Sequence, residues 1–447
     1  MYNTAVVKLH SHEIITNPFI PFDNDNYRTT IGTAFFIDDN TLLTCYHCIA
    51  NSVKVFISIP IISKEEYKVE VICSIPQFDI AILRCNMNIK HSILNIGDSE
   101  IVESLSIVIA LGYPMDSDSL KYTKGIISGF QNDLLQTDAS INPGNSGGPL
   151  LFKDKVIGIN SSKIESGDNI GFSIPINYFK NWYDYIKKNE SIKIIRLPYF
   201  HITYCNMNDE GLGFFKKKGY PWESGVLVTK SKESVILEGD ILYSINDKVI
   251  DNYGQIKIGL KYKLSFIEFY KQFTYNDTVT IQGYRNEKTF KVTFNILENT
   301  NNNCKINTVY QFFENFDYII IGGIVIMPLT KNHLSKLSSN DNIIRLNKYN
   351  LFQYNKKDDE NVIFISNILV GSPIISMDII NAGDIIININ NKTVKTMTDV
   401  REALKNPIDK NLLLYTNNDC LFIQSYKTLL EIDNLLQNNY KYEKISQ

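Results

Sequence analysis

Short apolar runs separated by turn residues are the feature that most restricts the fold of the N-terminal part of the chain. Between residue 6 and about residue 175, β-branched and aromatic residues gather in runs such as TAFFI, SVKVFISI and KVIGI. Asn, Asp, Gly and Pro fill the segments between these runs, as is typical of turns. Short strands alternating with turns predict an all-β barrel or sandwich.

A helical pattern closes this region. The stretch INYFKNWYDYIKK, near 176–189, places apolar residues at helical spacing and ends in lysine, which suits a helix C-terminus. A chain of 447 residues is long enough for roughly three domains. We predict a first domain at 1–195, a second at 196–300 and a third at 301–447.

An internal repeat occupies the second half of the chain. GDILYSINDKVI from Gly239 and GDIIININNKTV from Gly383 share Gly-Asp-Ile, then Ile-Asn, then Lys. Each copy reads as a Gly-Asp turn followed by a strand, and helical patterns follow at 265–273 and 398–405. The repeat predicts two related α+β modules.

Composition excludes several classes of protein. With 44% hydrophobic and 21% charged residues the chain is of the globular type. Its net charge of −3 and its single compact basic run, Lys216 to Lys218, argue against a nucleic-acid partner. The most apolar segment, 318–329, is shorter than the roughly 20 residues that span a bilayer. No secretory signal pattern opens the sequence, and its seven cysteines are scattered, so we expect reduced thiols in the cytoplasm or another intracellular compartment.

Ser146 lies between glycines in TDASINPGNSGGPL, residues 137–150. Glycine permits positive φ and the close approach of another group. If Ser146 attacks a carbonyl, the N–H groups of Gly144 and Ser146 are placed to face the developing oxyanion. A glycine-rich surface turn is the alternative, and these residues alone leave it open.

A nucleophilic serine needs a base, which a third group orients. In TLLTCYHCIA, an apolar strand ends at Thr44, which places His47 just beyond the end of that strand. In QFDIAILRC, Asp79 opens another apolar strand, where a partly buried carboxylate needs a hydrogen-bond donor. A histidine N–H would satisfy it.

Seven segments in one order extend this argument: GTAFFID, TCYHCIA, FDIAIL, GYP, KGIISG, TDASINPGNSGGPL and GFSIPI. In order and approximate spacing they resemble the Deg/HtrA serine proteases, in which His, Asp and Ser follow one another along the chain. The segment at 322–334 is similar to eukaryotic-type Deg-like proteases with a second, atypical PDZ domain. The resemblance implies a mainly β protein, a chymotrypsin-like double β-barrel followed by two PDZ-like α+β domains.

The resemblance also implies roles. His47 would be the general base, Asp79 would orient it, Ser146 would attack, and the N–H groups of Gly144 and Ser146 would form the oxyanion hole. Family members assemble as trimers or multiples of trimers, which implies a homo-oligomer here. Aromatic residues near the start of the chain are candidates for its interface: Tyr2, Phe19 and Phe22.

Two departures from secreted trypsins are visible. Trypsins pair the cysteine after the catalytic histidine with another cysteine, but Gly32 stands at that second position, so Cys48 lacks this partner. Residue 145 is Asn where trypsins have an Asp that receives a new N-terminus. We therefore expect no activation by chain cleavage.

Specificity residues follow from the same resemblance. Ser140 would lie near the base of the substrate pocket, where trypsin carries an acid, with Ile141 and the strand NSSK at 160–163, including Ser161, as walls. An uncharged pocket predicts cleavage after small or medium aliphatic residues.

The stretch DEGLGFFKKKG contains Gly-Leu-Gly-Phe, the PDZ signature for binding a peptide C-terminus. We expect the N–H groups of Leu212, Gly213 and Phe214 to receive the terminal carboxylate. A glycine-containing turn is the alternative. The second module lacks such a loop, which favours contacts between subunits or domains.

The spacing in CYHC also fits a zinc ligand pair, with Cys73 and Cys85 as further candidates, but no second CxxC occurs. Small buried thiols are the simpler interpretation, so we expect no metal and no cofactor.

The sequence thus predicts an ATP-independent serine endopeptidase for unfolded or misfolded proteins, since no P-loop pattern is present. A peptide-binding chaperone or scaffold with a latent protease domain is the alternative. A processing enzyme with one dedicated substrate is a third possibility.

Overall fold

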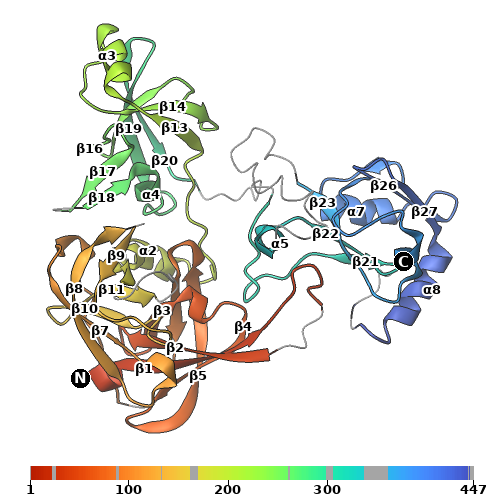
Figure 1. Cartoon of the computed structure of the whole chain (residues 1–447), viewed down its shortest axis with the longest axis horizontal. Coiled ribbons are helices and arrows are strands. Elements are labelled where there is room, and N and C mark those ends of the chain that lie inside the picture. The colour runs from red at the N-terminus through yellow and green to blue at the C-terminus, as the bar shows by residue number, and fades with distance from the viewer. Residues whose placement is uncertain are drawn as a thin grey trace. The chain divides into compact units, whose positions relative to one another are not determined.

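The computed structural model describes residues 2–22, 27–86, 90–131, 133–161, 170–259, 262–297, 306–336, 361–440 and 442 (Figure 1). The chain forms two compact units. One comprises Met1–His12 and Thr29–Asn299, and the other comprises Glu13–Arg28 and Thr300–Gln447. None of the described helices has the length and apolar character needed to span a lipid bilayer.

Two closed six-stranded barrels begin the first unit. In the first, the order of strands is β1-β2-β3-β6-β5-β4. Their bounds, with that of the short helix α1 before them, are α1 (Tyr2–Ala5), β1 (Val6–Ile14), β2 (Tyr27–Phe36), β3 (Thr41–Cys45), β4 (Ser52–Ile59), β5 (Ser63–Ile75) and β6 (Ile80–Arg84). The pair β3 and β6 is antiparallel and buried along almost all its length. Apolar side chains on both faces explain why these strands read as continuous apolar runs.

The second barrel has the strand order β10-β11-β12-β9-β8-β7. Its strands are β7 (Ile107–Gly112), β8 (Lys121–Gln131), β9 (Leu134–Thr137), β10 (Pro149–Phe152), β11 (Lys155–Ser161) and β12 (Gly171–Pro175). The helix α2 (Ile176–Lys188) follows, as its apolar spacing predicts, and buries Trp182 completely. The expected double β-barrel of the chymotrypsin type is confirmed.

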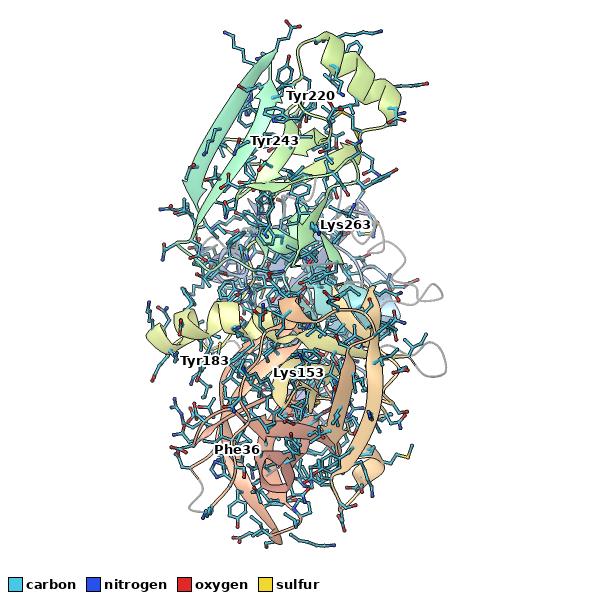
Figure 2. The ribbon with its side chains drawn as sticks, turned by 90° about the vertical axis from the view of Figure 1, so that its left-hand side faces the viewer. Phe36, Lys153, Tyr183, Tyr220, Tyr243 and Lys263 are labelled. Carbon is cyan, nitrogen blue, oxygen red and sulfur yellow. The ribbon has the colours of Figure 1, made fainter. Side chains whose placement is uncertain are left out.

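The third part of the first unit is a PDZ-type sheet in the order β13-β14-β15-β19-β20. Its elements, with an attached hairpin, are β13 (Ile202–Asn206), α3 (Asp209–Lys217), β14 (Val226–Ser231), β15 (Ile241–Ile245), β16 (Lys248–Val249), β17 (Gln255–Ile258), β18 (Tyr262–Ser265), α4 (Phe266–Tyr270), β19 (Thr278–Arg285) and β20 (Lys288–Asn295). Trp222 stacks on Tyr243 at 3.6 Å and meets Tyr220 edge-on. Figure 2 shows Tyr220, from the segment between α3 and β14, near Tyr243 of β15, and Phe36 within the first barrel.

The second unit contains a three-stranded sheet, β21-β22-β23, and a four-stranded sheet, β25-β24-β26-β27. Its elements are β21 (Ile319–Ile321), β22 (Ile324–Pro328), α5 (Lys331–Lys336), β23 (Ile363–Ile368), β24 (Ile386–Ile389), β25 (Lys392–Thr393), α7 (Met397–Leu404), β26 (Asn411–Thr416), β27 (Leu421–Ser425) and α8 (Tyr426–Leu436). Gly322 and Gly323, with φ of 59° and 80°, form the two-residue turn between β21 and β22. Positive φ at both turn residues is typical of a type I′ hairpin.

The segment Glu13–Arg28 belongs to this second unit. Phe19 packs edge-on against Phe364, and Phe22 contacts Tyr318 and Tyr442. The segment Glu13–Arg28 thus lies in a different unit from the rest of the proposed first domain, 1–195. Phe19 and Phe22, two of the candidates for a subunit interface, contact aromatic residues of the second unit. Tyr2 instead contacts Tyr122 edge-on. The remaining boundaries, near 195 and 300, stay a prediction.

The internal repeat has a common structural basis. In the first copy, Asp240 accepts a hydrogen bond from the N–H of Leu237 at 2.7 Å. In the second copy, Asp384 accepts one from the N–H of Asn381 at 2.8 Å. Each aspartate thus accepts a hydrogen bond from the N–H three residues earlier, and the two copies form equivalent turns before their strands begin.

Candidate active site

His47 and Asp79 lie together, although they come from different elements. His47 is in the 3₁₀ turn η1 (Tyr46–Cys48), directly after β3, and Asp79 directly precedes β6. The antiparallel pairing of Cys45 with Ile80 brings these two positions side by side. His47 Nδ1 lies 2.7 Å from Asp79 Oδ2, and the backbone N–H of His47 donates to Asp79 Oδ1 at 2.8 Å. Because a carboxylate only accepts, Nδ1 carries a proton, and in the neutral imidazole Nε2 is left as the acceptor.

Asp79 is held by its own backbone as well. The 3₁₀ turn η2 (Pro76–Phe78) ends at Asp79, whose φ of 58° and ψ of 37° are left-handed. Asp tolerates this conformation better than most residues. The carbonyl oxygen of Asp79 accepts the N–H of Tyr46 at 3.0 Å. The backbone and both carboxylate oxygens of Asp79 thus bind η1.

The turn that carries Ser146 packs against the same strand end. Gly147 has a φ of 84°, and a Cβ there would lie 2.1 Å from Thr33 O and 3.1 Å from Cys45 N. The N–H of Gly147 donates to Asn160 O at 2.8 Å. No residue with a side chain fits this position, which answers why glycine follows Ser146. The Ser146 turn therefore lies against the strand end that leads to His47.

The backbone at Gly144 is also defined. Gly144 has a φ of 98°, and a Cβ there would lie 2.4 Å from Tyr113 O. The carbonyl of Pro143 accepts the N–H of Met115 at 2.9 Å. Since none of the peptide bonds among the described residues is cis, the N–H of Gly144 points away from Met115.

Thr33 fixes the carbonyls of both candidate oxyanion residues, and sequence reasoning missed it. Its N–H donates to Ser146 O at 2.9 Å, and its hydroxyl donates to Gly144 O at 2.7 Å. The same hydroxyl accepts the N–H of Tyr113 at 3.0 Å. Thr33 is fully buried. The only trace of this role in the sequence is a hydroxyl residue between Gly32 and the apolar run at 34–36.

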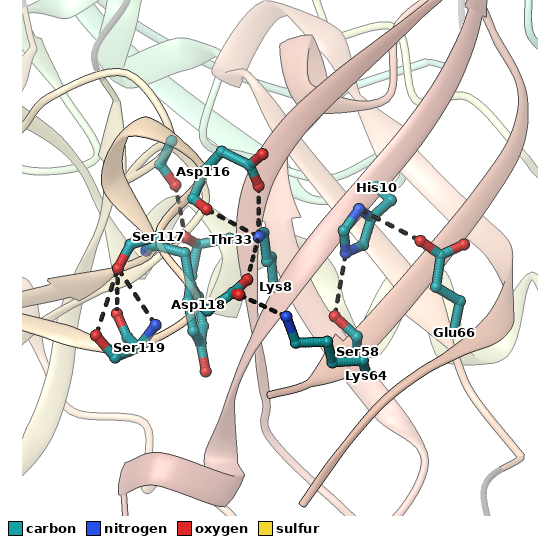
Figure 3. A network of polar contacts seen from close by, with 12 residues as sticks. Lys8, His10, Thr33, Ser58, Lys64, Glu66, Asp116, Ser117, Asp118 and Ser119 are labelled. Atoms are coloured by element: carbon teal, nitrogen blue, oxygen red, sulfur yellow. Dashed lines mark hydrogen bonds and ion pairs between the residues drawn. The ribbon is translucent and has the colours of Figure 1, made fainter. Parts of the chain in front are cut away.

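A buried lysine holds the loop that follows Met115. Lys8 Nζ binds Asp116 O at 3.1 Å and Asp118 Oδ1 at 3.4 Å, and it forms an ion pair with the Asp116 carboxylate. Figure 3 shows Lys8 between Asp116 and Asp118, with Thr33 nearby. The Lys8 side chain is only 5% exposed, so this contact restrains the loop from inside the protein.

Electrostatics favours the protonated form of His47. Burial opposes protonation, but the hydrogen bond with Asp79 and the contact with Cys48 outweigh it and raise the pKa of His47. The neighbouring side chain of Cys45 lowers the pKa of Cys48, whereas burial raises the pKa of Cys45. The hydrogen bond to Asp79 thus stabilises the imidazolium that forms when His47 takes up a proton.

The residues predicted for the substrate pocket are only partly brought together. Ser161 is buried, and its hydroxyl donates to Asp79 Oδ2 at 3.4 Å, so it supports the carboxylate. Ser140 is exposed, and its carbonyl accepts from the Thr123 hydroxyl at 3.0 Å. Ile141 lies beside Gly171, where a Cβ would meet its side chain at 3.0 Å. The other residues of NSSK, 162 and 163, lie outside the described residues.

The two departures from trypsins fit the structure. Cys48 is a free thiol, as expected. A Cβ at Gly32 would lie 3.0 Å from Cys48 Sγ, so the thiol takes the space of the missing partner. Asn145 is buried and its N–H closes a turn on Asn142 O at 2.9 Å.

The expected carboxylate-binding loop is wrong. Leu212, Gly213 and Phe214 lie inside α3, and the N–H of Leu212 donates to Asn208 O at 2.9 Å. N–H groups beyond the first helical turn bond within the helix, so they are not open donors for a carboxylate. Asn208 caps this helix through a hydrogen bond to Gly211 N, with acidic residues in the first turn and lysines in the last. These signals for a helix outweigh the two glycines.

Comparison with known proteins agrees with this architecture. A family model for the trypsin-like peptidase domain matches residues 32–159, and one for the PDZ domain matches residues 308–443. The chain is similar to Protease Do-like 4, mitochondrial, of Arabidopsis thaliana, at 24% identity over 470 residues, 98% of this chain and 85% of that protein. It is 31% identical over 240 residues to the serine protease Do-like HtrA of Bacillus subtilis (strain 168), 47% of this chain and 50% of that protein.

A solved structure has the same fold. The HtrA-type protease AlgW with tripeptide aligns with a TM-score of 0.50 and 21% identity, covering 65% of this chain and 92% of that one. The paired barrels, the PDZ-type domains and the named relatives agree with one another. The chain belongs to the Deg/HtrA serine endopeptidases, with a trypsin-like peptidase domain followed by PDZ-type domains.

Proposed function

We propose that this endopeptidase cleaves unfolded or misfolded proteins without ATP, through an acyl-enzyme, with His47, Asp79 and Ser146 as its catalytic triad. The observation that carries the proposal is the pair of hydrogen bonds between His47 and the two oxygens of Asp79, at 2.7 and 2.8 Å. One carboxylate thereby fixes both the tautomer and the backbone of the histidine. This is the arrangement that a general base requires.

In the acylation step, Ser146 Oγ attacks the scissile carbonyl and its proton passes to His47 Nε2. The Nδ1–H group stays bonded to Asp79, which stabilises the resulting imidazolium. His47 then gives this proton to the leaving amine. In deacylation, a water molecule takes the place of Ser146 as nucleophile and the same proton transfers free the enzyme.

The oxyanion of each tetrahedral intermediate is proposed to lie at the N–H groups of Gly144 and Ser146. Support comes from the Pro143 carbonyl, which bonds to Met115 and so directs the N–H of Gly144 to the opposite side. Donors fixed before the reaction stabilise developing charge without reorganisation.

Substrate choice belongs to the same proposal. Ser140, Ile141 and Gly171 carry no charge, and the side chain of Ile141 lies against Gly171. Such walls suit small or medium aliphatic residues before the cleaved bond. A peptide C-terminus is proposed to bind the first PDZ-type domain by adding to an edge strand of its sheet, β13 or β20, rather than at α3.

Assembly and compartment complete the proposal. We propose a homotrimer or a multiple of it, of the eukaryotic type with two PDZ-like domains. The six described cysteines are free thiols, which suits a reducing intracellular compartment.

The test is cleavage of reduced casein by the full chain and by its Ser146→Ala variant, with mass spectrometry of the products. We expect cleavage after aliphatic residues by the unaltered chain alone. Equal cleavage by both forms would exclude Ser146 as the nucleophile. Absence of cleavage together with peptide binding would favour a chaperone or scaffold, and cuts after lysine or arginine would contradict the pocket.

A further inference from the structure

Two thiols flank the proposed catalytic histidine. Cys45 ends β3 and is the N-cap of η1, with φ of −75° and ψ of 143°, and Cys48 is the third residue of that turn. Side chains at the N-cap and the third residue of a helical turn lie close together, as in the capping box. The Cys45 thiol donates to Asn160 O at 3.2 Å, and the Cys48 thiol donates to Ser146 O at 3.5 Å. Both are almost fully buried, at 0% and 3% exposure.

These thiols share their environment with His47 and Asp79. Cys45 Sγ, a ring nitrogen of His47 and a carboxylate oxygen of Asp79 all lie within 4.8 Å of one another. Cys48 Sγ is not one of these three atoms, and its thiol donates to Ser146 O at 3.5 Å. The atoms gathered here are therefore one sulfur, one nitrogen and one oxygen, and the Cys48 thiol lies nearby on the same helical turn. Among the residues that the structure describes, no other group of His, Cys, Asp and Glu is gathered in this way.

We propose that Cys45, Cys48, His47 and Asp79 bind a thiophilic divalent cation of the zinc type, and that the bound cation inhibits the peptidase. Four ligands of this kind complete a tetrahedral zinc site. Thiolate ligands favour zinc over magnesium or calcium, which prefer oxygen. Neither Cys73 nor Cys85, the additional ligands considered from the sequence, is needed.

Binding requires a small rearrangement. Metal–ligand distances of about 2.0 to 2.3 Å place tetrahedral ligands roughly 3.5 Å apart. The ligand atoms of Cys45, His47 and Asp79 lie within 4.8 Å of one another, so they must move closer together, and the Cys48 side chain must turn toward them. Each thiol releases its proton on binding. Cys45 also gives up its hydrogen bond to Asn160 O at 3.2 Å, and Cys48 its contact with Ser146 O at 3.5 Å. The second contact joins the metal ligands to the Ser146 turn.

Inhibition follows from the choice of ligands. A cation on Nδ1 of His47 replaces the hydrogen bond to Asp79, and a cation on Nε2 occupies the atom that must accept the Ser146 proton. Either way the histidine no longer acts as a base. This consequence depends on the proposed function, whereas metal binding does not.

Binding is tested with Co²⁺ as a spectroscopic probe on the full chain carrying Ser146→Ala, which prevents self-cleavage. The chain is reduced, desalted and titrated without oxygen. We expect one equivalent of Co²⁺ to give the intense visible bands of tetrahedral cobalt and a thiolate-to-metal charge-transfer band. Zn²⁺ should abolish both, because zinc binds more tightly than cobalt. Cys45→Ala and Cys48→Ala should each remove the charge-transfer intensity in proportion to the sulfur lost.

Cys73→Ala is the matched control, since Cys73 is another buried thiol, which contacts Ser74 O at 3.8 Å. It should leave the cobalt spectrum unchanged. A spectrum without a thiolate band would overturn the proposal, as would equal losses in Cys45→Ala and Cys73→Ala. Where an alanine variant unfolds by circular dichroism, the serine variant at the same position takes its place.

Inhibition is tested with Zn²⁺ on the Ser146 enzyme, each variant being compared with its own metal-free rate. We expect Zn²⁺ to inhibit the unaltered enzyme reversibly, with recovery on adding a chelator, and Cys45→Ala to need at least tenfold more Zn²⁺. Unchanged inhibition in that variant would place the metal elsewhere. Inactivation by an oxidant alone, reversed by a thiol reductant, would indicate a Cys45–Cys48 disulfide instead. A cobalt site in a chain without any peptidase activity would refute the proposed function but keep the metal site.

Discussion

The hydroxyl of Thr33 donates a hydrogen bond to the carbonyl oxygen of Gly144 at 2.7 Å, while it accepts the N–H of Tyr113 at 3.0 Å. One buried side chain thus connects the proposed oxyanion residue to the end of β7. The backbone N–H of Thr33 adds a bond to Ser146 O. Thr33 is therefore a positioning residue for both proposed oxyanion donors.

Thr33→Val should lower kcat by roughly 10-fold to 100-fold with little change in KM. The variant keeps the shape of Thr33 but leaves Gly144 O and Tyr113 N without a partner, at a cost of about 1–3 kcal/mol. Steady-state kinetics on a peptide substrate measures the effect. Thr33→Ser, which keeps the hydroxyl, is the control and should retain most of the activity. An equal loss in both variants would assign the effect to packing rather than to the hydrogen bonds.

Asp79→Asn should lower kcat by on the order of 10⁴-fold without unfolding the barrel, because an amide can donate to Nδ1 and so select the wrong tautomer. Ser161→Ala removes a single, longer hydrogen bond of 3.4 Å to the same carboxylate and should have a much smaller effect. Steady-state assays of both variants on the same peptide substrate give the two values of kcat to compare. Comparable losses would mean that Asp79 does not set the tautomer of His47.

Asp240→Asn should destabilise the first PDZ-type domain by about 1.5–3 kcal/mol, because it removes the charge that Arg285 binds through two hydrogen bonds. Arg285 binds both oxygens of Asp240, at 2.6 and 2.7 Å. In the second copy of the repeat, Asp384 accepts from the Asn418 amide at 2.5 Å. Asp384→Asn should therefore cost only about 1 kcal/mol. Urea unfolding followed by Trp222 fluorescence measures the first change, and hydrogen exchange of β24 the second. The reverse order would contradict this account.

Acid should lower the stability of the second unit, because His333 becomes protonated. This side chain is fully buried; Nδ1 accepts the N–H of Thr330 at 3.0 Å, and Nε2 donates to Pro18 O at 2.9 Å. Burial lowers the pKa of His333 from 6.5 to about 4. Its ring lies beside Phe19, Phe316 and Phe364. The protonated ring would lose the Thr330 bond and gain no counter-charge from these neighbours.

The sign of this effect follows from the lowered pKa. Between about pH 6.5 and pH 4 the unfolded chain binds the proton more tightly than the folded one, so stability is complete above this window and falls as pH falls through it. The full loss is about 3 kcal/mol for a shift of this size. Hydrogen exchange of β21 and β22 at pH 7 and pH 5 measures it. His333→Gln, which does not titrate, should show no such difference, and a pH-independent result in the unaltered chain would contradict the prediction.

Local patterns determined much of this protein without tertiary information. Apolar spacing located the helix α2. The repeated Gly-Asp identified two related turns because Asp240 and Asp384 each bond to a backbone N–H only three residues away. The sequence alone was enough to choose His47, Asp79 and Ser146 as the candidate triad, because the order of their motifs is a property of the chain itself.

Tertiary structure decided the features that depend on contacts between segments far apart in the sequence. The helix at Leu212, Gly213 and Phe214 depends on its cap and its charged ends, which a short glycine motif does not reveal. Segment Glu13–Arg28 joins the second unit because Phe19 and Phe22 find aromatic partners there. Thr33 and Ser161 acquire their roles only when the barrels close and bring them to Gly144 and Asp79. Their hydrogen bonds span 111 and 82 residues of chain, and no local propensity encodes contacts over such separations.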